Sequence, residues 1–360
     1  MIADLKTWIG EKSGSTNSEG TRGYDYRTIM PARQFACAAP TLIGPPLAEY
    51  VGDHETGERE SFVARLPRAR VFMRTGVVIT EDDQVVEESC CWGRDSLDSD
   101  MELNSLRPLV KCTRLSGEYL TIVSRGWTNY YHWLTECLTR LCVAESCGPL
   151  PILLPRGMTD WHRESLKLMG VNEDRWQLVD DGCYEVDRLC FPSFPGWLGR
   201  MAEWAIRGVG EKITNEVKKA GGKRLYVGRE GVKYRRVVNE PAILTRLHAA
   251  GFESVSGHAL DFRTEVETFA NADVIIGVHG AGMANLIFAR PGTKVIEILD
   301  PLHAVPSYYN LSIRLGHDYS YMFADNCATL EKAPSQKGYD DLQIPLDRLE
   351  AALRSVSGGD

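Results

Sequence analysis

The chain has 360 residues, of which 43% are hydrophobic and 25% are charged, and its formal net charge is −8. The composition is ordinary for a globular protein, and the length favours two domains over one. The acidic balance argues against nucleic-acid binding, which needs a basic surface. No run approaches the roughly 18 apolar residues of a membrane span. The first residues, MIADLKTWIGEKSGS, lack the pattern of a secretory signal, so we expect a cytoplasmic location.

Ten cysteines are spread along the chain, and none of them forms a C-x-x-C pair. In a chain of this size without a signal, free thiols are expected rather than a disulfide framework. The lack of paired spacing also argues against a metal site built from cysteines.

The first part of the chain shows few periodic patterns. Residues 1–60 are rich in Gly, Ser, Thr and Pro, and we expect an extended, loop-rich segment there. Residues 69–90 hold three short β-rich runs and predict an antiparallel meander with Asp82–Asp83 at a hairpin turn. Further on, Asp98 and Asp100 form a D-x-D pair, a pattern that can hold a metal ion. In a turn rich in Ser and Asp, the pair predicts a solvated loop or a helix cap instead.

The stretch TNYYHWLTECLTRLCVAE (128–145) predicts a helix that follows a strand over residues 119–124. One side of this helix is apolar at helical spacing, with Leu134, Cys137, Leu138 and Leu141. The other side aligns Asn129, His132, Glu136 and Arg140, in which His132–Glu136 and Glu136–Arg140 are i,i+4 neighbours. This side is either a solvated face with ordinary ion pairs or the seat of an acid/base pair. The aromatic residues at the helix start are either core or a platform for sugar rings: Trp127, Tyr130, Tyr131 and Trp133.

Strand and helix patterns alternate from here to the end of the chain, which predicts an α/β fold. Pro192 and Pro195–Gly196 interrupt the first alternation, and a charged helical segment follows up to Gly221–Gly222. A second alternation starts with RLYVGR (224–229) and predicts a Rossmann-like domain. The predicted organisation is an N-terminal domain with the meander, a linker helix, a second domain, and a C-terminal helix that packs back: 1–195, 196–222, 223–345 and 346–360.

Residues 273–298, DVIIGVHGAGMANLIFARPGTKVIEI, hold the strongest ligand signal. A buried strand is followed by a turn with Gly277, Gly280 and Gly282, a short helix over about residues 283–289, and a second strand that ends in acid. Such a turn presents backbone N–H groups and a helix N-terminus to a diphosphate. The spacing is neither that of the dinucleotide fingerprint nor that of a P-loop. His279 adds a donor, although close packing by the glycines and a structural histidine remain the alternative.

Basic side chains follow the first strand of the second domain. Arg229 ends that strand, and Arg235 and Arg236 lie in the next loop. Guanidinium groups at such positions suit diphosphate oxygens.

Four stretches of the sequence resemble the glycosyltransferase 61 family, the DUF563-type group related to capsular-polysaccharide biosynthesis. They are NYYHWLTECLTRL (129–141), YVGREGVKYRRVVNE (226–240), residues 260–298 and YYNLSIRLGHDY (308–319). The resemblance implies a GT-B architecture, in which two Rossmann-like domains face a central cleft. It also implies an inverting glycosyltransferase that uses a nucleotide-activated sugar, usually UDP-linked, and needs no metal or other cofactor.

The resemblance carries roles to individual residues. In the first domain, Glu136 would be the catalytic base, with His132 as the alternative base or the orienting partner. The acceptor side would include Asn129, Tyr130, Tyr131 and Trp133. The donor would be held by Arg229, Arg235, Arg236, His279, Gly280, Ala281, Gly282, Met283, Asn285 and Glu297. Glu297 would meet the ribose or nearby donor hydroxyls.

The chain departs from the family pattern at two places. It carries Glu at position 136, where relatives can carry Asp, and Met283–Ala284, where Leu-Thr is common; neither change breaks the pattern. A glycan acceptor in surface polysaccharide synthesis is expected. Peripheral contact with a membrane-bound acceptor and a homodimer stay open. A sugar-nucleotide-binding protein without activity and a GT-B epimerase are the competing functions.

Overall fold

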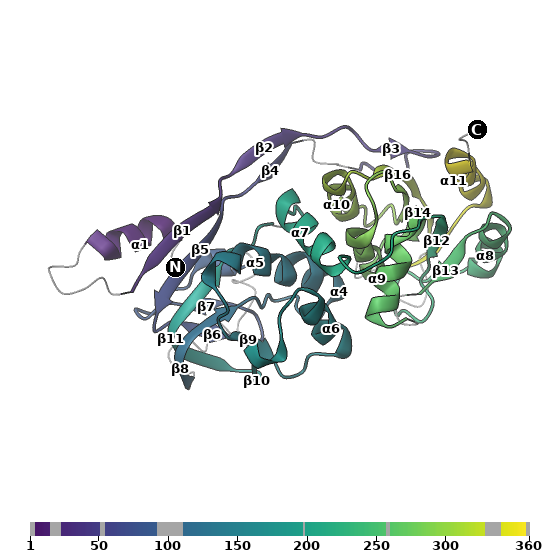
Figure 1. Cartoon of the computed structure of the whole chain (residues 1–360). Helices are drawn as coiled ribbons and strands as arrows, with labels where there is room; N and C mark the ends of the chain where they lie inside the picture. Colours follow the sequence, from purple (N-terminus) through teal and green to yellow (C-terminus); the bar gives the residue numbers. More distant parts are fainter. Residues whose placement is uncertain are drawn as a thin grey trace. The chain divides into compact units, whose positions relative to one another are not determined.

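The computed structural model describes residues 4–14, 23–50, 55–91, 111–196, 199–256, 260–327 and 340–357. Its helices and its parallel and antiparallel sheets confirm the α/β class (Figure 1). The chain divides into two compact units: Met1–Gln34 with Gly57–Lys212, and Phe35–Thr56 with Ile213–Asp360. Among the helices of the described residues, none is long and apolar enough to cross a membrane.

The first unit is built on a mixed sheet whose strand order is β1-β5-β11-β8-β9-β10. The pairs β11–β8, β8–β9 and β9–β10 are parallel, whereas β1–β5 and β5–β11 are antiparallel. The bounds of the strands on this path are β1 (Asp25–Met30), β5 (Ser61–Pro67), β8 (Thr113–Thr121), β9 (Ile152–Pro155), β10 (Trp176–Val179) and β11 (Cys183–Pro192).

The predicted meander is present beside this path. Strand β6 (Arg70–Phe72) pairs antiparallel with β7 (Val78–Ile79) and with β11. An isolated antiparallel bridge joins Ile79 to Val85, and Asp83 adopts a left-handed φ of 62° in the turn between them. The hairpin turn at Asp82–Asp83 is therefore confirmed.

The loop-rich start was an incomplete prediction, because the chain forms helix α1 (Leu5–Gly14) before β1. Leu5 and Ile9 are one helical turn apart, and both are buried in the core of the first unit. Two apolar residues at this spacing are a weak signal in the sequence, and the helix depends on the sheet that covers them.

The predicted helix at 128–145 forms as a composite. It consists of α4 (Tyr130–His132), a π-helical turn η2 (Trp133–Cys137), α5 (Leu138–Val143) and a 3₁₀ turn η3 (Ala144–Cys147). Leu134, Cys137, Leu138 and Leu141 are all buried, which confirms the apolar stripe. The described residues of this unit also form η1 (Glu87–Ser89), α6 (Asp160–Leu168), η4 (Glu173–Arg175) and α7 (Glu203–Ile213).

The cysteine prediction was wrong at one pair, because Cys112 and Cys183 form a disulfide. Tyr184 pairs with Thr113 across the parallel strands β11 and β8, so the preceding cysteines lie side by side. The two residues are 71 positions apart in the sequence, and no local spacing could reveal the pair. The other cysteines of the described residues are not disulfide-bonded.

The second unit contains a six-stranded parallel sheet in the order β13-β12-β14-β15-β16-β3. The helices α8, α9, α10 and α11 lie around this sheet (Figure 1). The strands are β3 (Thr41–Leu42), β12 (Lys223–Val227), β13 (Glu253–Val255), β14 (Ala272–Val278), β15 (Lys294–Leu299) and β16 (Asp318–Phe323). The helices are α8 (Glu240–Ala249), α9 (Phe262–Ala270), α10 (Ser307–Leu315) and α11 (Leu346–Ser357). Helix α11 packs its apolar side onto this core, as expected of the C-terminal helix.

The strand order of the second unit identifies where a ligand can bind. Among strands β12 to β16, β12 comes first along the chain but lies between β13 and β14 in the sheet. The chain therefore adds β13 on one side of β12 and then crosses to add β14 on the other side. In open parallel sheets, ligands bind beyond the carboxyl ends of the strands at such a switch point. Here those ends lead into Gly228–Arg229 and into His279–Gly280.

The division into units differs from the predicted boundaries. Residues 35–56 leave the first unit and add β3 to the edge of the second sheet. One small sheet joins β2 (Arg33–Ala36) to β4 (Glu55–Glu58), and another joins β17 (Asp325–Cys327) antiparallel to β18 (Asp341–Gln343). Helix α7, predicted as part of a linker, clusters with the first unit up to Lys212.

Candidate functional site

The glycine turn of the second unit has the predicted strand–turn–helix–strand form. Strand β14 ends at Val278, and a 3₁₀ helix, η5 (Ala281–Phe288), takes the place of the short α-helix that was expected. A side chain at Gly280 would place its Cβ 2.0 Å from Nη1 of Arg229. A side chain at Gly277 would place its Cβ 2.1 Å from Sδ of Met283. These glycines therefore admit neighbouring side chains of the same unit to the turn.

Arg229 supplies a half-buried positive charge beside this turn. Its Nη2 donates to the carbonyl of Tyr234 at 2.7 Å, and its backbone N–H donates to Oε1 of Glu240 at 3.2 Å. Burial, and then the charge of Arg235, lower the pKa of Arg229 to about 10, so the guanidinium stays charged at neutral pH. The structure thus brings Arg229 and Gly280 together, as the sequence predicted.

His279 is held by a buried chain of hydrogen bonds. Its Nδ1 lies 2.5 Å from Oε1 of Glu297, and the hydroxyl of Tyr319 donates to the other carboxylate oxygen at 2.5 Å. The hydroxyl of Tyr50 lies 3.1 Å from that of Tyr319. The pKa of Tyr319 is raised well above its usual range by burial and by the charge of Glu297. This keeps the phenol protonated as a donor.

The role predicted for Glu297 is therefore wrong. Its side chain is 0% exposed, and both carboxylate oxygens are engaged by protein groups. It cannot meet a ribose hydroxyl in this structure, and it orients the imidazole of His279 instead. The partner that reveals this, Tyr319, lies on β16 and could not be linked to Glu297 from sequence spacing.

Two other predicted donor residues contact groups of the second unit, and their role at the donor stays a prediction. The guanidinium of Arg236 is paired with Asp341, with Nη2 2.6 Å from Oδ2 and Nε 3.2 Å from Oδ1. Arg236 thus ties its loop to β18. Met283 is fully buried, and its thioether fills the space above Gly277.

The remaining predicted donor residues lie at or beside the turn. Ala281 and Gly282 open η5 and are partly exposed, whereas Asn285 is buried. Arg235 has a left-handed φ of 52°. Burial, and then the charges of His279 and Arg235, lower the pKa of His303, whose ring centre is 5.6 Å from that of His279. Sequence reasoning missed Tyr308, whose hydroxyl donates to the carbonyl of Gly280 at 2.6 Å.

In the first unit, His132 and Glu136 form a close pair on the composite helix. Nδ1 of His132 lies 2.7 Å from Oε1 of Glu136, and their side chains are 26% and 14% exposed. Asn129 caps the helix, because its side-chain oxygen accepts from the backbone N–H of Tyr131 at 3.0 Å. Two half-buried groups in contact, one of them a histidine, have the geometry of an acid/base pair.

Arg140 does not belong to a solvated polar face, which corrects the predicted alignment. It is fully buried, and its guanidinium donates to the carbonyls of Pro192 and Val123, each at 2.9 Å. Burial lowers its pKa to about 10. Its Cζ also lies 4.3 Å from the ring centre of Phe194. The π-helical turn Trp133–Cys137, which contains Glu136, shifts the helical phase before Arg140, and a sequence read at 3.6 residues per turn does not anticipate this shift.

The aromatic residues at the helix start separate into two kinds. Trp133 is fully buried, and its Nε1 donates to Oγ of Ser165 at 2.8 Å, so it is a core residue and not an acceptor contact. Tyr130 and Tyr131 are half-buried. Their assignment to an acceptor stays a prediction.

The clusters of potential metal ligands bear on the predicted absence of a metal. Among the residues that the structure describes, no group of three or more His, Cys, Asp and Glu side chains is placed to hold a metal ion. Asp98 and Asp100 of the D-x-D pair lie outside those residues. The expectation that the pair holds no metal therefore stays a prediction.

A family model described as Glycosyltransferase 61 matches residues 130–296. The match runs from the start of α4 to β15, so it includes the His132–Glu136 pair, Arg229 and the His279–Gly280 turn. This confirms the resemblance drawn from the sequence.

Three curated proteins also match parts of the chain. An EGF domain-specific O-linked N-acetylglucosamine transferase of Drosophila melanogaster is 38% identical over 69 residues, which is 18% of this chain and 13% of that protein. The β-1,2-xylosyltransferase RCN11 of Oryza sativa subsp. japonica is 34% identical over 53 residues, covering 15% and 10% of the two chains. A β-1,2-xylosyltransferase of Arabidopsis thaliana is 27% identical over 104 residues, covering 25% and 20%. The matches therefore span 20% or less of each relative's length.

Proposed function

Because this chain belongs to the glycosyltransferase 61 family through residues 130–296, we propose that it is a glycosyltransferase. It transfers a sugar from a nucleotide diphosphate donor, a UDP-sugar, to a hydroxyl of a glycan, with inversion and without a metal ion. The two units correspond to the two halves of a GT-B enzyme. Surface polysaccharide synthesis is the proposed setting. The names of the relatives make xylose and N-acetylglucosamine the first sugars to test.

The observation that carries this proposal is the half-buried guanidinium of Arg229 against Gly280 at the switch point of the parallel sheet. A diphosphate leaving group develops negative charge as the glycosidic bond breaks. A preorganised cation in a water-poor site stabilises that charge without reorganisation. The backbone of the turn can add N–H donors.

His279 is the second donor-site group. Glu297 holds Nδ1, so Nε2 is the ring atom left for a ligand. In its protonated form the imidazole can donate from Nε2 to a phosphate oxygen. Glu297 and Tyr319 act through His279 and do not touch the donor.

The His132–Glu136 pair supplies the base. An inverting transfer needs one group to remove the proton from the acceptor hydroxyl while that oxygen attacks the anomeric carbon. Glu136 holds Nδ1 of His132, and the imidazole is the more exposed of the two side chains. This arrangement favours His132 as the group that takes the proton, with Glu136 as its orienting partner. The order is the reverse of the one first expected.

The test combines donor binding with turnover. UDP should raise the melting temperature of the full chain, since a ligand that binds only the native state stabilises it. Incubation with UDP-xylose or UDP-N-acetylglucosamine should release UDP. Arg229→Ala should lower kcat/KM by about 10²-fold or more, and Arg229→Lys should restore it only in part.

Arg236→Ala is the matched control, because Arg236 is paired with Asp341 and should change stability without reducing turnover. Binding of UDP without release from either donor would point to a non-catalytic sugar-nucleotide protein. Conversion of the donor sugar to its epimer would point to an epimerase. Unchanged UDP binding and turnover in Arg229→Ala would remove the donor site from this turn.

A further inference from the structure

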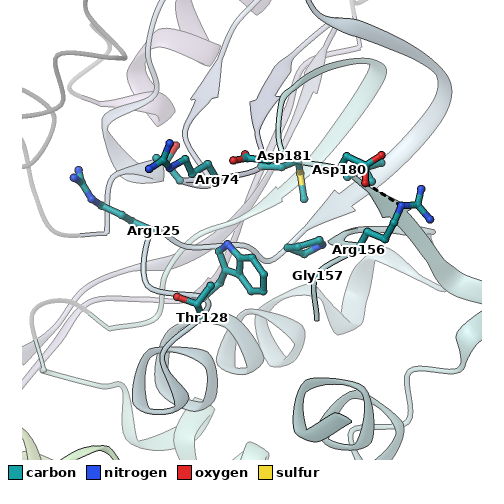
Figure 2. Close-up of a pocket in the computed structure, with 12 residues that line it drawn as sticks. Arg74, Arg125, Thr128, Arg156, Gly157, Asp180 and Asp181 are labelled. Atoms are coloured by element: carbon teal, nitrogen blue, oxygen red, sulfur yellow. Dashed lines mark hydrogen bonds and ion pairs between the residues drawn. The ribbon is translucent and has the colours of Figure 1, made fainter. Parts of the chain in front are cut away.

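The first unit contains a cavity that none of the sequence motifs identified. Its volume is about 540 Å³, and it lies where β8, β9 and β10 end, next to the turn between β6 and β7 (Figure 2). The charged residues that line it are Arg74, Arg125, Arg156, Asp180 and Asp181, and the aromatic one is Trp127. The carboxyl ends of neighbouring parallel strands are the usual place for a ligand in an α/β sheet.

Charges of both signs line the cavity. Figure 2 shows Arg125 and Arg74 toward one end, Asp181 and Asp180 beyond them, and Arg156 at the other end. Arg156 donates to Asp180 at 3.0 Å. A strongly anionic ligand would lie against two carboxylates, and a strongly cationic one would lie against three guanidinium groups. A neutral ligand with many hydroxyls avoids both costs, because each hydroxyl can donate to a carboxylate and accept from a guanidinium.

Trp127 gives the cavity a rigid apolar wall. The ring of His162 lies 5.5 Å from that of Trp127, and its Nε2 lies 3.0 Å from the carbonyl of Trp127. Nδ1 of His162 accepts from the backbone N–H of Thr159 at 3.1 Å, so Nε2 carries the proton and donates to that carbonyl. Burial lowers the pKa of His162 to about 4, which keeps this neutral arrangement at physiological pH.

The chain segment that carries Trp127 also contacts His132, the proposed base. Gly126 lies between Arg125 and Trp127, and a Cβ on it would be 2.6 Å from Cγ of His132. The imidazole of His132 therefore packs on the backbone of the segment that lines the cavity. Thr128, another lining residue, directly precedes the Asn129 cap of the helix that carries His132 and Glu136. A ligand in this cavity would thus be separated from His132 by the segment 125–128 alone.

We propose that this cavity binds the acceptor of the transfer reaction as a neutral saccharide. The indole of Trp127 packs on a sugar ring, while Asp181 and the neighbouring guanidinium groups bind its hydroxyls. The inference rests on the proposed glycosyltransferase function and names the acceptor subsite of that enzyme. It replaces Trp133, which is core, with Trp127 as the aromatic acceptor contact.

Saturation-transfer NMR on the full chain tests the proposal with defined probes. The probes are the methyl glycosides of xylose, glucose, galactose, mannose and N-acetylglucosamine, and the panel also includes inorganic phosphate as an anionic competitor. At least one glycoside should bind, and phosphate should not displace it. Trp127→Ala should weaken that binding by tenfold or more, and Trp127→Phe should retain part of it. Asp181→Asn should weaken it as well.

Asp174→Asn is the matched control, since Asp174 is an exposed carboxylate of the same unit outside the cavity. The UDP-induced rise in melting temperature should be the same in all of these variants. Asp181 is exposed, so its variant tests the cavity even if Trp127→Ala fails to fold.

Three results would overturn the inference. The first is no glycoside binding by the wild-type chain. The second is equal glycoside binding by Trp127→Ala, Asp181→Asn and the wild type. The third is loss of the UDP response in the cavity variants, which would make the cavity a nucleotide site. A failed donor site appears differently, as wild-type chain that binds glycosides but shows no UDP response.

Discussion

The contact between His132 and Glu136 leads to the most direct residue-scale prediction. His132→Asn should reduce kcat by about 10²- to 10⁴-fold, the usual contribution of a positioned base, while UDP still raises the melting temperature. Glu136→Gln should cost less, because the amide oxygen can still accept from Nδ1 of His132. Rates of sugar transfer and UDP thermal shifts measure both effects.

Glu211→Gln serves as the control, since Glu211 is an exposed carboxylate of the same unit. If Glu136→Gln is the more damaging change, the proton is taken by Glu136, as the sequence first suggested. If both variants transfer sugar normally, this pair is a structural contact and the base lies elsewhere.

Individual residues were predictable from the sequence where their partners are local. His279 and Gly280 follow a buried strand directly, and Arg229 lies two residues after the end of the neighbouring strand of the same sheet. Residue roles failed where the partner comes from a distant segment. The sequence predicted that Glu297 contacts the donor, but the hydroxyl of Tyr319 occupies its second carboxylate oxygen. It also predicted that Arg236 binds the diphosphate, but the guanidinium pairs with Asp341.

At the scale of elements, the composite helix is positioned by the segment that precedes it. The φ of Gly126 is not in the left-handed region, so its backbone conformation does not require glycine. A Cβ at this position would nevertheless overlap the imidazole of His132. Gly126→Ala should therefore push His132 away from Glu136 and lower kcat by about tenfold or more, with UDP binding unchanged. Gly10→Ala in α1 is the matched glycine control, because nothing lies within 4 Å of the added methyl group.

Transfer rates and UDP thermal shifts of the two glycine variants decide the outcome. Normal turnover by Gly126→Ala would show that the imidazole can move without loss of function. The composite helix also shows the limit of pattern reading. Its apolar stripe was predicted correctly. Arg140 was predicted on the polar side, but it is buried, because the π-helical turn Trp133–Cys137 changes the helical phase before it.

The disulfide between β8 and β11 should stabilise the first unit. Closing a loop of 71 residues removes conformational entropy from the unfolded chain, and the polymer estimate is about 4 kcal/mol at 25 °C. Cys112→Ser should lower the unfolding free energy by about 2–4 kcal/mol, measured by urea denaturation with fluorescence. Cys327→Ser, a thiol of the second unit that is not in a disulfide, is the control.

Equal stability of Cys112→Ser and wild type under non-reducing conditions would contradict this. Mass spectrometry after alkylation of protein from its native cells adds a second readout. Disulfides persist in oxidising compartments and are rare in the cytosol, so alkylated Cys112 and Cys183 would support the predicted cytoplasmic location. An intact bridge would argue against it.

At the scale of the whole molecule, the sequence indicated two α/β halves, but not how the chain is shared between them. Alternating strand and helix patterns were enough for the second sheet from β12 to β16. They could not place residues 35–56, which contribute the two-residue β3 to that sheet in the part of the segment that the structure describes. Its partner β16 lies far along the chain, and pairing over such a distance leaves no periodic signal.

The pairing of residues 35–56 with the second sheet leads to a prediction about the second unit, which holds the proposed donor site. The backbone N–H of Ile43 donates to the carbonyl of Tyr321 on β16 at 2.8 Å, and Tyr50 extends the hydrogen-bond chain that runs through Tyr319 to Glu297. Ile43→Pro removes the backbone donor and should release the edge strand. The unfolding free energy of the second unit should fall by about 1–3 kcal/mol. Hydrogen exchange in β16 should accelerate, and UDP binding should weaken as His279 loses its support.

Ile43→Ala is the matched control, because it removes the same apolar side chain and keeps the N–H. The difference between the two variants therefore isolates the backbone bond. Leu47→Pro adds a second control, since Leu47 is 43% exposed in the same segment. If Ile43→Pro matches Ile43→Ala in exchange and in UDP binding, the edge strand only covers the sheet. If Ile43→Pro accelerates exchange and weakens UDP binding more than Ile43→Ala does, residues 35–56 complete the donor site. They would do so by supporting His279 through the edge strand, although they lie outside residues 130–296, the part matched by the family model.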